Sequence, residues 1–134
     1  MANVTSGGVV PNKGVNITCI GHGVLTVGQW VCITDPYHVQ LPDARGDLST
    51  IGYVLVGNKV TGEDVTVATR FKCVDTFLMG LAVSAGDPVV VGTNGKLYPY
   101  SPSASPGFSD SCCSIVGIAL TDAAAAVGCD VGIF

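Results

Sequence analysis

Ala82–Val91 reads AVSAGDPVVV, and Val24–Ile33 reads VLTVGQWVCI. In both stretches an apolar segment leads to a glycine, a polar residue and then a run of residues that favour strands. Gly28 and Gly86 stand where a tight turn needs positive φ, which glycine adopts without a steric penalty. The two stretches therefore predict one turn-and-strand motif that occurs twice in the chain.

Two further blocks recur in the same order along the chain. The matched pairs are Ser49–Leu55 with Ser114–Leu120, and Gly62–Val67 with Gly128–Ile133. Gly52 and Gly117 interrupt the strands of the first pair, where glycine marks a bulge or a close approach of two backbones. Three matched blocks in one order predict an internal duplication. The predicted units are residues 24–73 and 81–134.

Short runs of valine and isoleucine, separated by glycine, asparagine, aspartate and proline, are typical of a β-sandwich or β-barrel. The predicted strands are Val15–Ile20, Trp30–Thr34, Ile51–Val56, Val65–Cys73, Pro88–Val91, Lys96–Tyr100, Ser114–Leu120 and Asp130–Phe134. Asn94-Gly95 is a strong hairpin signal and should join two of these strands. Thr121–Ala126 is rich in alanine but is long enough only for a turn. The predicted fold class is all-β, with a single small barrel or sandwich domain over residues 15–134.

The first fourteen residues are polar and rich in glycine, and they lack the alternation of a strand. Residues 1–14 are therefore predicted to form an extended N-terminal arm, which a partner would order. Ser101–Asp110, rich in serine and proline, is predicted to be a flexible surface loop. The arm and this loop are the segments of the chain that look least like parts of a core.

The chain has few charges: charged residues make up 12% of its 134 residues, about half the usual share. Such a domain is expected to bury part of its surface against a partner or against copies of itself. The net charge is −4, and the six lysines and arginines form no basic stripe, so no nucleic-acid or membrane partner is predicted. The chain shows neither a signal peptide nor an apolar stretch of membrane-spanning length, so cytoplasmic synthesis is expected.

Six cysteines do not predict a disulfide framework here, because the secretory context is missing. Cys19, Cys32 and Cys73 lie inside apolar runs and are interpreted as small core residues. Cys112 and Cys113 are adjacent, and their redox state stays open. The absence of a C-x-x-C spacing argues against a zinc site, so no metal and no cofactor are predicted.

Catalytic signatures are also missing, and the chain is not predicted to be an enzyme. The two histidines, His22 and His38, lie in turn-rich segments, and no G-x-S-x-G elbow is present. The carboxylates lie mostly beside glycine, proline or serine, where they usually bond the local backbone. Arg45-Gly46-Asp47 matches an adhesion tripeptide but is better interpreted as an ordinary turn.

Three aromatic residues leave a second function open. Trp30, Tyr98 and Tyr100 lie on predicted strands, and spaced aromatic rings can stack against sugars or bases. Aromatic residues are also ordinary sheet and interface residues, which is the favoured interpretation. A carbohydrate- or ligand-binding β module of a virion or tail component therefore remains the alternative.

Three segments carry a family resemblance: Ala85–Leu97, Ile115–Ala126 and Asp130–Ile133. An A-G-D-x-V strand, a hairpin ending in G-K-L, a GIAL strand, an alanine-rich turn and a closing strand follow one another. This pattern resembles the capsid decoration, or cement, proteins of tailed bacteriophages, and the resemblance covers about residues 24–134. The six cysteines and the long Ser101–Asp110 loop depart from the pattern.

The resemblance implies a tulip-like or jelly-roll barrel and a homotrimer on the outer capsid surface of a virion. There the trimer would clamp neighbouring major capsid proteins. An arm can attach by adding a strand to the edge of a partner's sheet. The candidate capsid-binding residues are therefore in the arm: Ala2, Asn3, Val4, Thr5, Val9 and Val10.

Overall fold

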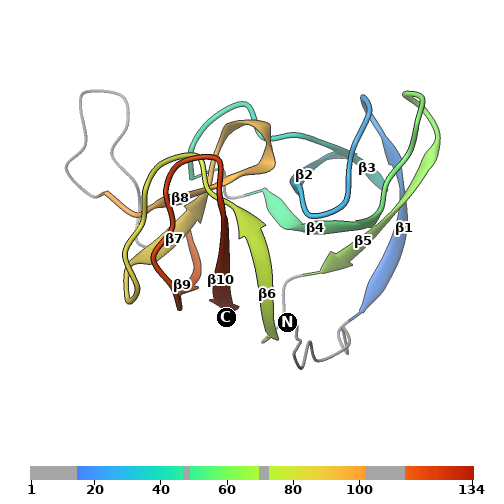
Figure 1. Cartoon of the computed structure of the whole chain (residues 1–134). Helices are drawn as coiled ribbons and strands as arrows, with labels where there is room; N and C mark the ends of the chain where they lie inside the picture. The colour runs from blue at the N-terminus through green and yellow to red at the C-terminus, as the bar shows by residue number, and fades with distance from the viewer. Residues whose placement is uncertain (1–14, 47–48, 70–72, 102–113) are drawn as a thin grey trace.

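The computed structural model describes residues 15–46, 49–69, 73–101 and 114–134. The predicted arm, Cys112, Cys113 and most of the Ser101–Asp110 loop lie outside these residues. The described chain forms ten strands in a closed barrel and a second sheet, which confirms the all-β fold class (Figure 1). The division into an arm and a single domain stays a prediction.

The first barrel contains five strands. They are β1 (Asn16–Gly21), β2 (Trp30–Asp35), β3 (His38–Gln40), β4 (Thr50–Val56) and β5 (Asp64–Thr69). Their order around the barrel is β1-β3-β2-β4-β5, and β1 closes it by pairing with β5. The pairing of β1 with β3 is parallel, with Gly21 opposite Val39.

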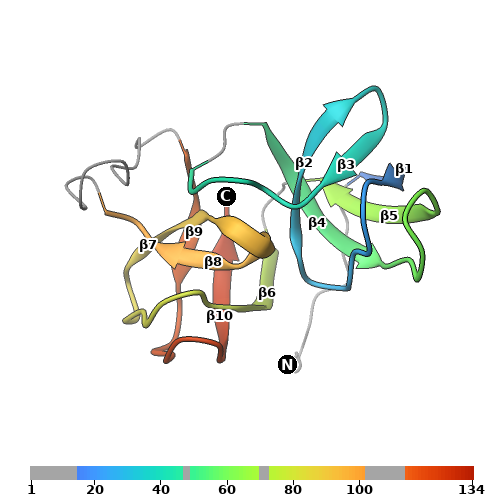
Figure 2. The ribbon, with the colours of Figure 1, turned by 90° about the horizontal axis from the view of Figure 1, so that it is seen from above.

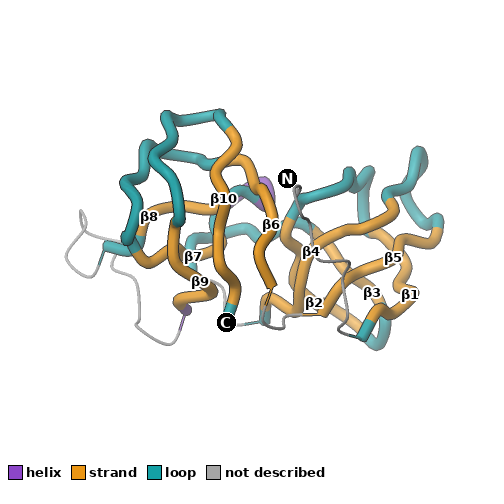
Figure 3. The backbone as a smooth tube through the Cα atoms, turned by 60° about the horizontal axis from the view of Figure 1, so that its bottom comes forward, coloured by secondary structure: helices purple, strands orange, loops and turns teal. Residues whose placement is uncertain are grey.

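The second sheet also contains five strands. They are β6 (Cys73–Leu78), β7 (Pro88–Val91), β8 (Leu97–Pro99), β9 (Ile115–Ala119) and β10 (Gly128–Ile133). Their order in the sheet is β6-β10-β9-β7-β8. The first barrel, read in the direction β1-β5-β4-β2-β3, has the same order, so each strand of the second sheet has a counterpart in the first barrel. A single parallel bridge, Met79 with Leu97, stands in the place of the β1–β3 pairing. The second sheet is thus an open copy of the first barrel, and the two lie side by side (Figure 2, Figure 3).

The registers of the two copies agree in detail. The pairing of β2 with β4 shifts after Val31, and the pairing of β7 with β9 shifts after Val89. Gly52 and Gly117 lie opposite these two residues, and a Cβ on either glycine would overlap a carbonyl oxygen of the neighbouring strand. Both predicted roles of these glycines, at a bulge and at a close approach, are therefore confirmed.

The turns before β2 and β7 also match. Gly28 has φ +89 and Gly86 has φ +94, as the sequence predicts. The Gly28 N–H donates to the Val54 carbonyl oxygen at 2.9 Å, and the Gly86 N–H donates to that of Ala119 at 2.7 Å. The same turn therefore leads into the same strand in each copy.

The third matched block is displaced by two residues relative to the prediction. Gly52 lies opposite Thr69, and Gly117 lies opposite Ile133, so these strand ends correspond. Gly62 precedes Thr69 by the same number of residues as Ala126 precedes Ile133, so these two residues correspond. Gly62 has φ +89 and Ala126 has φ +64. The sequence comparison instead aligned the G-x-D-V pattern shared by Gly62–Val65 and Gly128–Val131. A short shared pattern of residue types does not fix the register of strand pairing.

Two strand predictions differ from the structure. The predicted strand Val65–Cys73 covers β5 and only the first residue of β6, which belong to different sheets, and the rest of β6 was not predicted as a strand. β3 lies in a segment predicted to be a turn-rich loop, because a three-residue strand leaves almost no periodicity to recognise. The paired strand sets consequently span residues 16–69 and 73–133 and begin one strand earlier than the predicted units.

The predicted hairpin is confirmed. β7 pairs with β8 in an antiparallel register, and the short η1 turn (Thr93–Gly95) joins them. Asn94 has φ +61 and Gly95 has φ +72, the left-handed conformation that these two residue types tolerate best. The alanine-rich segment after β9 forms turns, as predicted.

The buried side chains form two clusters. The smaller, inside the first barrel, contains Cys19, Leu25, Val31, Val39, Val54, Val65 and Val67. By strand register, their counterparts in the second sheet are Phe77, Val83, Val89, Leu97, Ala119, Cys129 and Val131, all in the larger cluster. The larger cluster also contains Trp30, Tyr53 and Ala68, which come from the outer face of the first barrel. The larger cluster is therefore a core that both units share, and the smaller one belongs to the first barrel alone.

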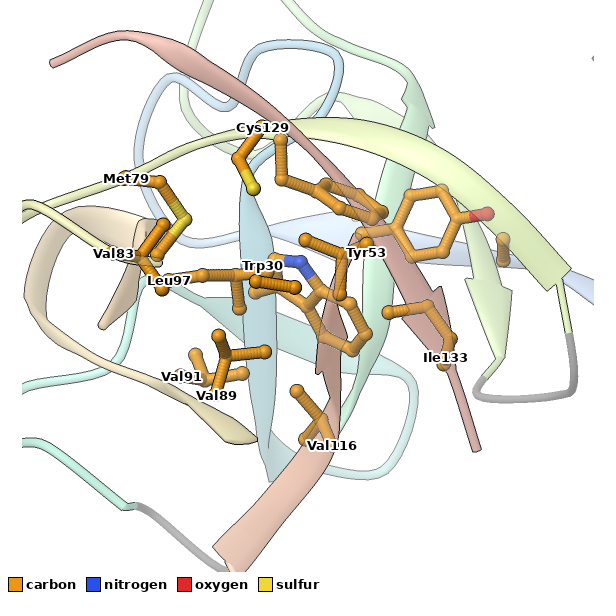
Figure 4. Close-up of a cluster of buried hydrophobic side chains, with 14 residues drawn as sticks. Trp30, Tyr53, Met79, Val83, Val89, Val91, Leu97, Val116, Cys129 and Ile133 are labelled. Atoms are coloured by element: carbon orange, nitrogen blue, oxygen red, sulfur yellow. The ribbon is translucent and has the colours of Figure 1, made fainter. Parts of the chain in front are cut away.

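Trp30 is the centre of this shared core (Figure 4). Its side chain is fully buried, and its ring centroid lies 5.2 Å from that of Tyr53 and 5.3 Å from that of Phe77. Gly95 packs closely against the Trp30 backbone, since a Cβ on Gly95 would lie 2.7 Å from the Trp30 carbonyl oxygen. Burying an aromatic side chain of this size contributes about 4–6 kcal/mol.

We expect Trp30→Ala to lower the free energy of unfolding by about 3–5 kcal/mol, because it leaves a cavity between the two units. The control is Pro88→Ala at the corresponding, partly exposed position of the second sheet, with an expected loss of about 1 kcal/mol or less. Urea unfolding measures both values. Similar losses for the two variants would contradict the central role of Trp30.

Ala126 holds a left-handed conformation that glycine holds at the matching position, Gly62. The strain of about 1–2 kcal/mol in alanine exceeds the entropy that glycine adds to the unfolded chain, about 0.4–1 kcal/mol. Ala126→Gly should therefore stabilise the fold by about 0.5–1 kcal/mol, and Gly62→Ala should destabilise it. Thermal unfolding tests both signs, with Ala124→Gly, outside the positive-φ positions, as the control that should bring no gain.

Candidate functional site

The described residues hold no group of three or more His, Cys, Asp and Glu side chains that could bind a metal ion. The rings of His22 and His38 meet edge to face with centroids 5.0 Å apart. His38 Nδ1 lies 2.9 Å from the Pro36 carbonyl oxygen. The two histidines, one after β1 and one at the start of β3, thus contact each other, and His38 also contacts the local backbone. No helix among the described residues has the length and apolar character needed to cross a membrane.

The cysteines of the described chain are packing residues. Cys19 and Cys32 are buried, which confirms the prediction for both, and Cys73 is partly buried. Cys129, which the prediction did not include, is also buried. Burial raises the pKa of the Cys19 and Cys73 thiols, so little nucleophilic thiolate forms at neutral pH.

Tyr53 and Cys73 connect the two units through a polar contact. The Tyr53 hydroxyl lies 3.6 Å from Cys73 Sγ. Burial raises the pKa of Tyr53 far above its ordinary value, and the hydrogen bond to Cys73 and the charge of Asp75 raise it further. The phenol is therefore held neutral as a structural group of the junction.

The Trp30 ring is enclosed in the shared core, which agrees with the favoured interpretation of the aromatic residues and removes Trp30 from the alternative of ligand stacking. Tyr98 lies against Gly80 and Gly92, where a Cβ would overlap its ring. The Arg45 guanidinium lies 5.2 Å from the centre of the Tyr98 ring. Tyr98 is therefore a packing residue, and of the three aromatic residues only Tyr100, which is partly buried, keeps the earlier interpretation open.

The Arg45-Gly46 pair joins the first barrel to the second sheet. Arg45 Nη2 donates to the Pro99 carbonyl oxygen at 2.7 Å, and the Gly46 N–H donates to that of Val91 at 2.8 Å. Asp47 lies outside the described residues. These contacts support the interpretation of the tripeptide as a structural segment.

A groove lies at the junction of the two units. Its lining comes from the turn before β2, the end of β6 and the loop before β8: Thr26, Val27, Gly28, Gln29, Thr76, Phe77, Leu78, Asn94, Gly95 and Lys96. Its volume of about 160 Å³ is below the roughly 300–1,000 Å³ of typical small-molecule sites. The groove is therefore smaller than a typical small-molecule site.

Four exposed valines form a second candidate surface, which we call the valine rim. They lie at the end of the first barrel where β1 and β4 finish: Val24, Val27, Val56 and Val60. At the positions corresponding to Val24, Val27 and Val60 the second unit has Ala82, Ala85 and Ala124, while Val56, opposite Thr66, corresponds to the exposed Leu120, which bonds Asp130. Because both copies keep the same backbone hydrogen bonds here, the fold itself does not require valine.

The candidate capsid-binding residues Ala2, Asn3, Val4, Thr5, Val9 and Val10 lie outside the described residues, so their role stays a prediction. Val15, the residue that follows the predicted arm, is exposed, and its carbonyl oxygen accepts a hydrogen bond from Thr69. Thr69 ends β5, so Val15 lies at the end of the barrel opposite to the valine rim.

Comparison with known proteins gives a match of fold. No protein-family model matches the chain, and no curated protein matches it. Among solved structures, the N base of the head fiber protein gp8.5 of bacteriophage phi29 matches with a TM-score of 0.63 and 16% sequence identity. The match covers 90% of this chain and 93% of that one. At this identity the two chains share a fold.

The raised pKa of Tyr53 predicts a loss of stability in alkali. The folded state holds this proton more tightly than the unfolded chain, so stability falls as the pH rises above the unfolded value of about 10. In Tyr53→Phe this part of the decline, at most about 1.4 kcal/mol per pH unit, should disappear. Urea unfolding at several pH values above about 10 measures this decline in the free energy of unfolding. Tyr37→Phe, which alters an exposed ring, should decline like the unchanged chain, and an equal decline in Tyr53→Phe would contradict the assignment.

Proposed function

We propose that this chain is a structural protein of a bacteriophage virion that decorates the outer surface of the head. In this role it reinforces contacts between major capsid proteins. The observation that carries the proposal is the fold shared with the N base of a phage head fiber protein along nearly the whole chain. The resemblance of the second unit to decoration proteins, read from the sequence, supports the same role.

The physical character of the described chain suits this role. The shared core around Trp30 ties the two units together, so the chain can transmit force between two points of contact. The junction groove is small, and the described residues offer apolar surfaces in place of a reaction centre. Burial of apolar surface is the main driving force of protein association, and it requires no charge on either partner.

We assign attachment to the N-terminal arm. β1 already pairs with β3 and β5, so the arm has no free edge beside β1 on its own barrel. Fourteen extended residues reach up to about 46 Å, far enough to lie along a neighbouring capsid sheet. Ala2, Asn3, Val4, Thr5, Val9 and Val10 would form the added strand and its flanks.

A homotrimer completes the proposal. Three linked arms bind together far more tightly than one, because the second and third arms attach from a high effective concentration. Attachment that is weak for a single arm thereby becomes stable on a shell. The major capsid protein is the proposed partner.

Deletion of residues 2–10 should weaken binding to the capsids of the encoding phage by at least about tenfold, or about 1.4 kcal/mol. The measurement is co-sedimentation of the purified chain with capsids that lack it. Circular dichroism and urea unfolding should show an unchanged fold, because the deleted residues precede β1.

The matched comparison is Val27→Lys/Val56→Lys on the valine rim, at the opposite end of the barrel. This variant should bind capsids like the unchanged chain, since only one end of the barrel can face the shell. Loss of binding in the rim variant with full binding by the deletion would reverse the proposed orientation. An unchanged chain that ignores its own capsids would overturn the proposed function.

A further inference from the structure

Asn94-Gly95 is a chemically reactive pair as well as a hairpin turn. Asn94 is the only asparagine of the chain that a glycine follows. In such a pair the backbone nitrogen of the glycine can attack Cγ of the asparagine, because glycine has no Cβ to obstruct the approach. The attack forms a succinimide ring and releases ammonia. The surroundings of the pair decide whether this reaction occurs in the folded chain.

The folded turn holds the two reacting atoms apart. Asn94 has ψ 16, so the Gly95 nitrogen nearly eclipses the backbone nitrogen of Asn94. Because Cα is tetrahedral, Cβ leaves it in a different direction from that nitrogen, and the Gly95 nitrogen is therefore turned away from the side chain. Ring closure requires the Gly95 nitrogen on the side of Cβ. The reaction therefore requires rotation about the Cα–C bond of Asn94.

Two hydrogen bonds resist this rotation. The Gly95 N–H, which belongs to the attacking nitrogen, donates to the Gly92 carbonyl oxygen at 3.2 Å. The Asn94 carbonyl oxygen accepts a hydrogen bond from Gln29 Nε2 at 3.4 Å. Both groups belong to the peptide bond that joins Asn94 to Gly95. Rotation of this peptide bond therefore breaks both hydrogen bonds.

The backbone of Trp30 also resists the rotation. Gly95 is buried, and a Cβ on it would lie 2.7 Å from the Trp30 carbonyl oxygen and 2.9 Å from the Trp30 nitrogen. Packing this close leaves little space for the peptide bond to turn while η1 lies against β2. Asn94 itself is exposed, so its side chain is accessible as soon as the turn moves. The turn must therefore separate from β2 before the ring can close.

We propose that Asn94 is a deamidation site controlled by the contact between η1 and Trp30. While the contact is closed, the pair is protected. When the turn separates from β2, the Gly95 nitrogen forms a bond to Cγ of Asn94, and the bond between Cγ and Nδ2 breaks. The proton of the Gly95 N–H leaves with Nδ2 as ammonia. Water then adds to one carbonyl carbon of the succinimide, and the bond from that carbon to nitrogen breaks. The nitrogen regains a proton, and the products are aspartate and isoaspartate.

The two products have different effects on the junction. Aspartate keeps the length of the main chain and places a carboxylate at an exposed position. Isoaspartate directs the main chain through Cβ, which adds a carbon atom to the backbone between β7 and β8. The longer turn cannot return Gly95 to its place against Trp30 and also keep the register of β7 with β8. Formation of isoaspartate therefore makes a transient opening of the junction permanent, whatever the partner of the chain.

The first test follows deamidation of the full chain in mildly alkaline buffer by peptide mass spectrometry. The unchanged chain should deamidate at Asn94 at least about tenfold more slowly than the same chain unfolded in guanidinium chloride, because the rate follows the population of the open turn. Asn94→Gln should nearly abolish the reaction in both states, because its longer side chain cyclises far more slowly. Equal rates in the folded and unfolded chain would overturn the proposal.

A matched pair of variants separates the junction from the fold as a whole. Phe77→Leu weakens the packing around Trp30, whereas Val67→Ala weakens the smaller core of the first barrel. Both lower the free energy of unfolding, and a little denaturant brings the more stable variant to the level of the other. At equal stability, deamidation should be several-fold faster in Phe77→Leu. Equal rates would show that global unfolding exposes the pair and would overturn control by the Trp30 contact.

Fluorescence tests the effect of the product. Trp30 is the only tryptophan of the chain, so its emission reports whether the junction is closed. The isoaspartate form, separated after ageing in denaturant and then refolded, should emit at longer wavelength than the unchanged chain, because the indole meets water. Asn94→Asp, which has the structure of the other product, should keep the emission of the unchanged chain. Identical emission from the isoaspartate form and Asn94→Asp would overturn the permanent opening.

Discussion

One buried indole holds this molecule together. Trp30 starts on the outside of a closed barrel, where a tryptophan would normally meet water, and it becomes interior only because a second sheet lies over it. Phe77 and Gly95 lie against it. Leu97 lies beside it in the same cluster (Figure 4). Since the smaller core alone contains only seven modest side chains, the joint core supplies most of the large apolar burial. The relative placement of all outer surfaces follows from this contact.

The duplication allows requirements of the fold to be separated from requirements of function. Where both copies keep the same residue type, as at Gly28 and Gly86, the backbone explains the choice. Where the backbone agrees and the side chains do not, as at Gly62 and Ala126, the backbone conformation alone does not explain the choice of residue. The candidate surfaces of this chain emerge from that comparison. The junction groove, at about 160 Å³, is smaller than a typical small-molecule site.

Much of the fold could be predicted from the sequence, because it depends on local chemistry. Glycine turns, valine-rich strands and the Asn94-Gly95 hairpin all have short-range causes. The short β3 and the two-residue displacement at Gly62 escaped prediction, because strand pairing over long separations decides them. Trp30 was expected on a strand, but which face would be covered depends on a sheet that begins more than forty residues later.

The order of the strands has a consequence for synthesis on the ribosome. The first barrel is complete once Thr69 has emerged, and it then displays Trp30 and Tyr53 while the strands that will cover them are still being made. Domains fold in this N-to-C order during translation, and exposed apolar surface in partial chains promotes misassembly. On a polysome, a nascent first barrel can accept the finished second sheet of a neighbouring chain. Every nascent chain therefore passes through a stage at which domain swapping competes with correct closure.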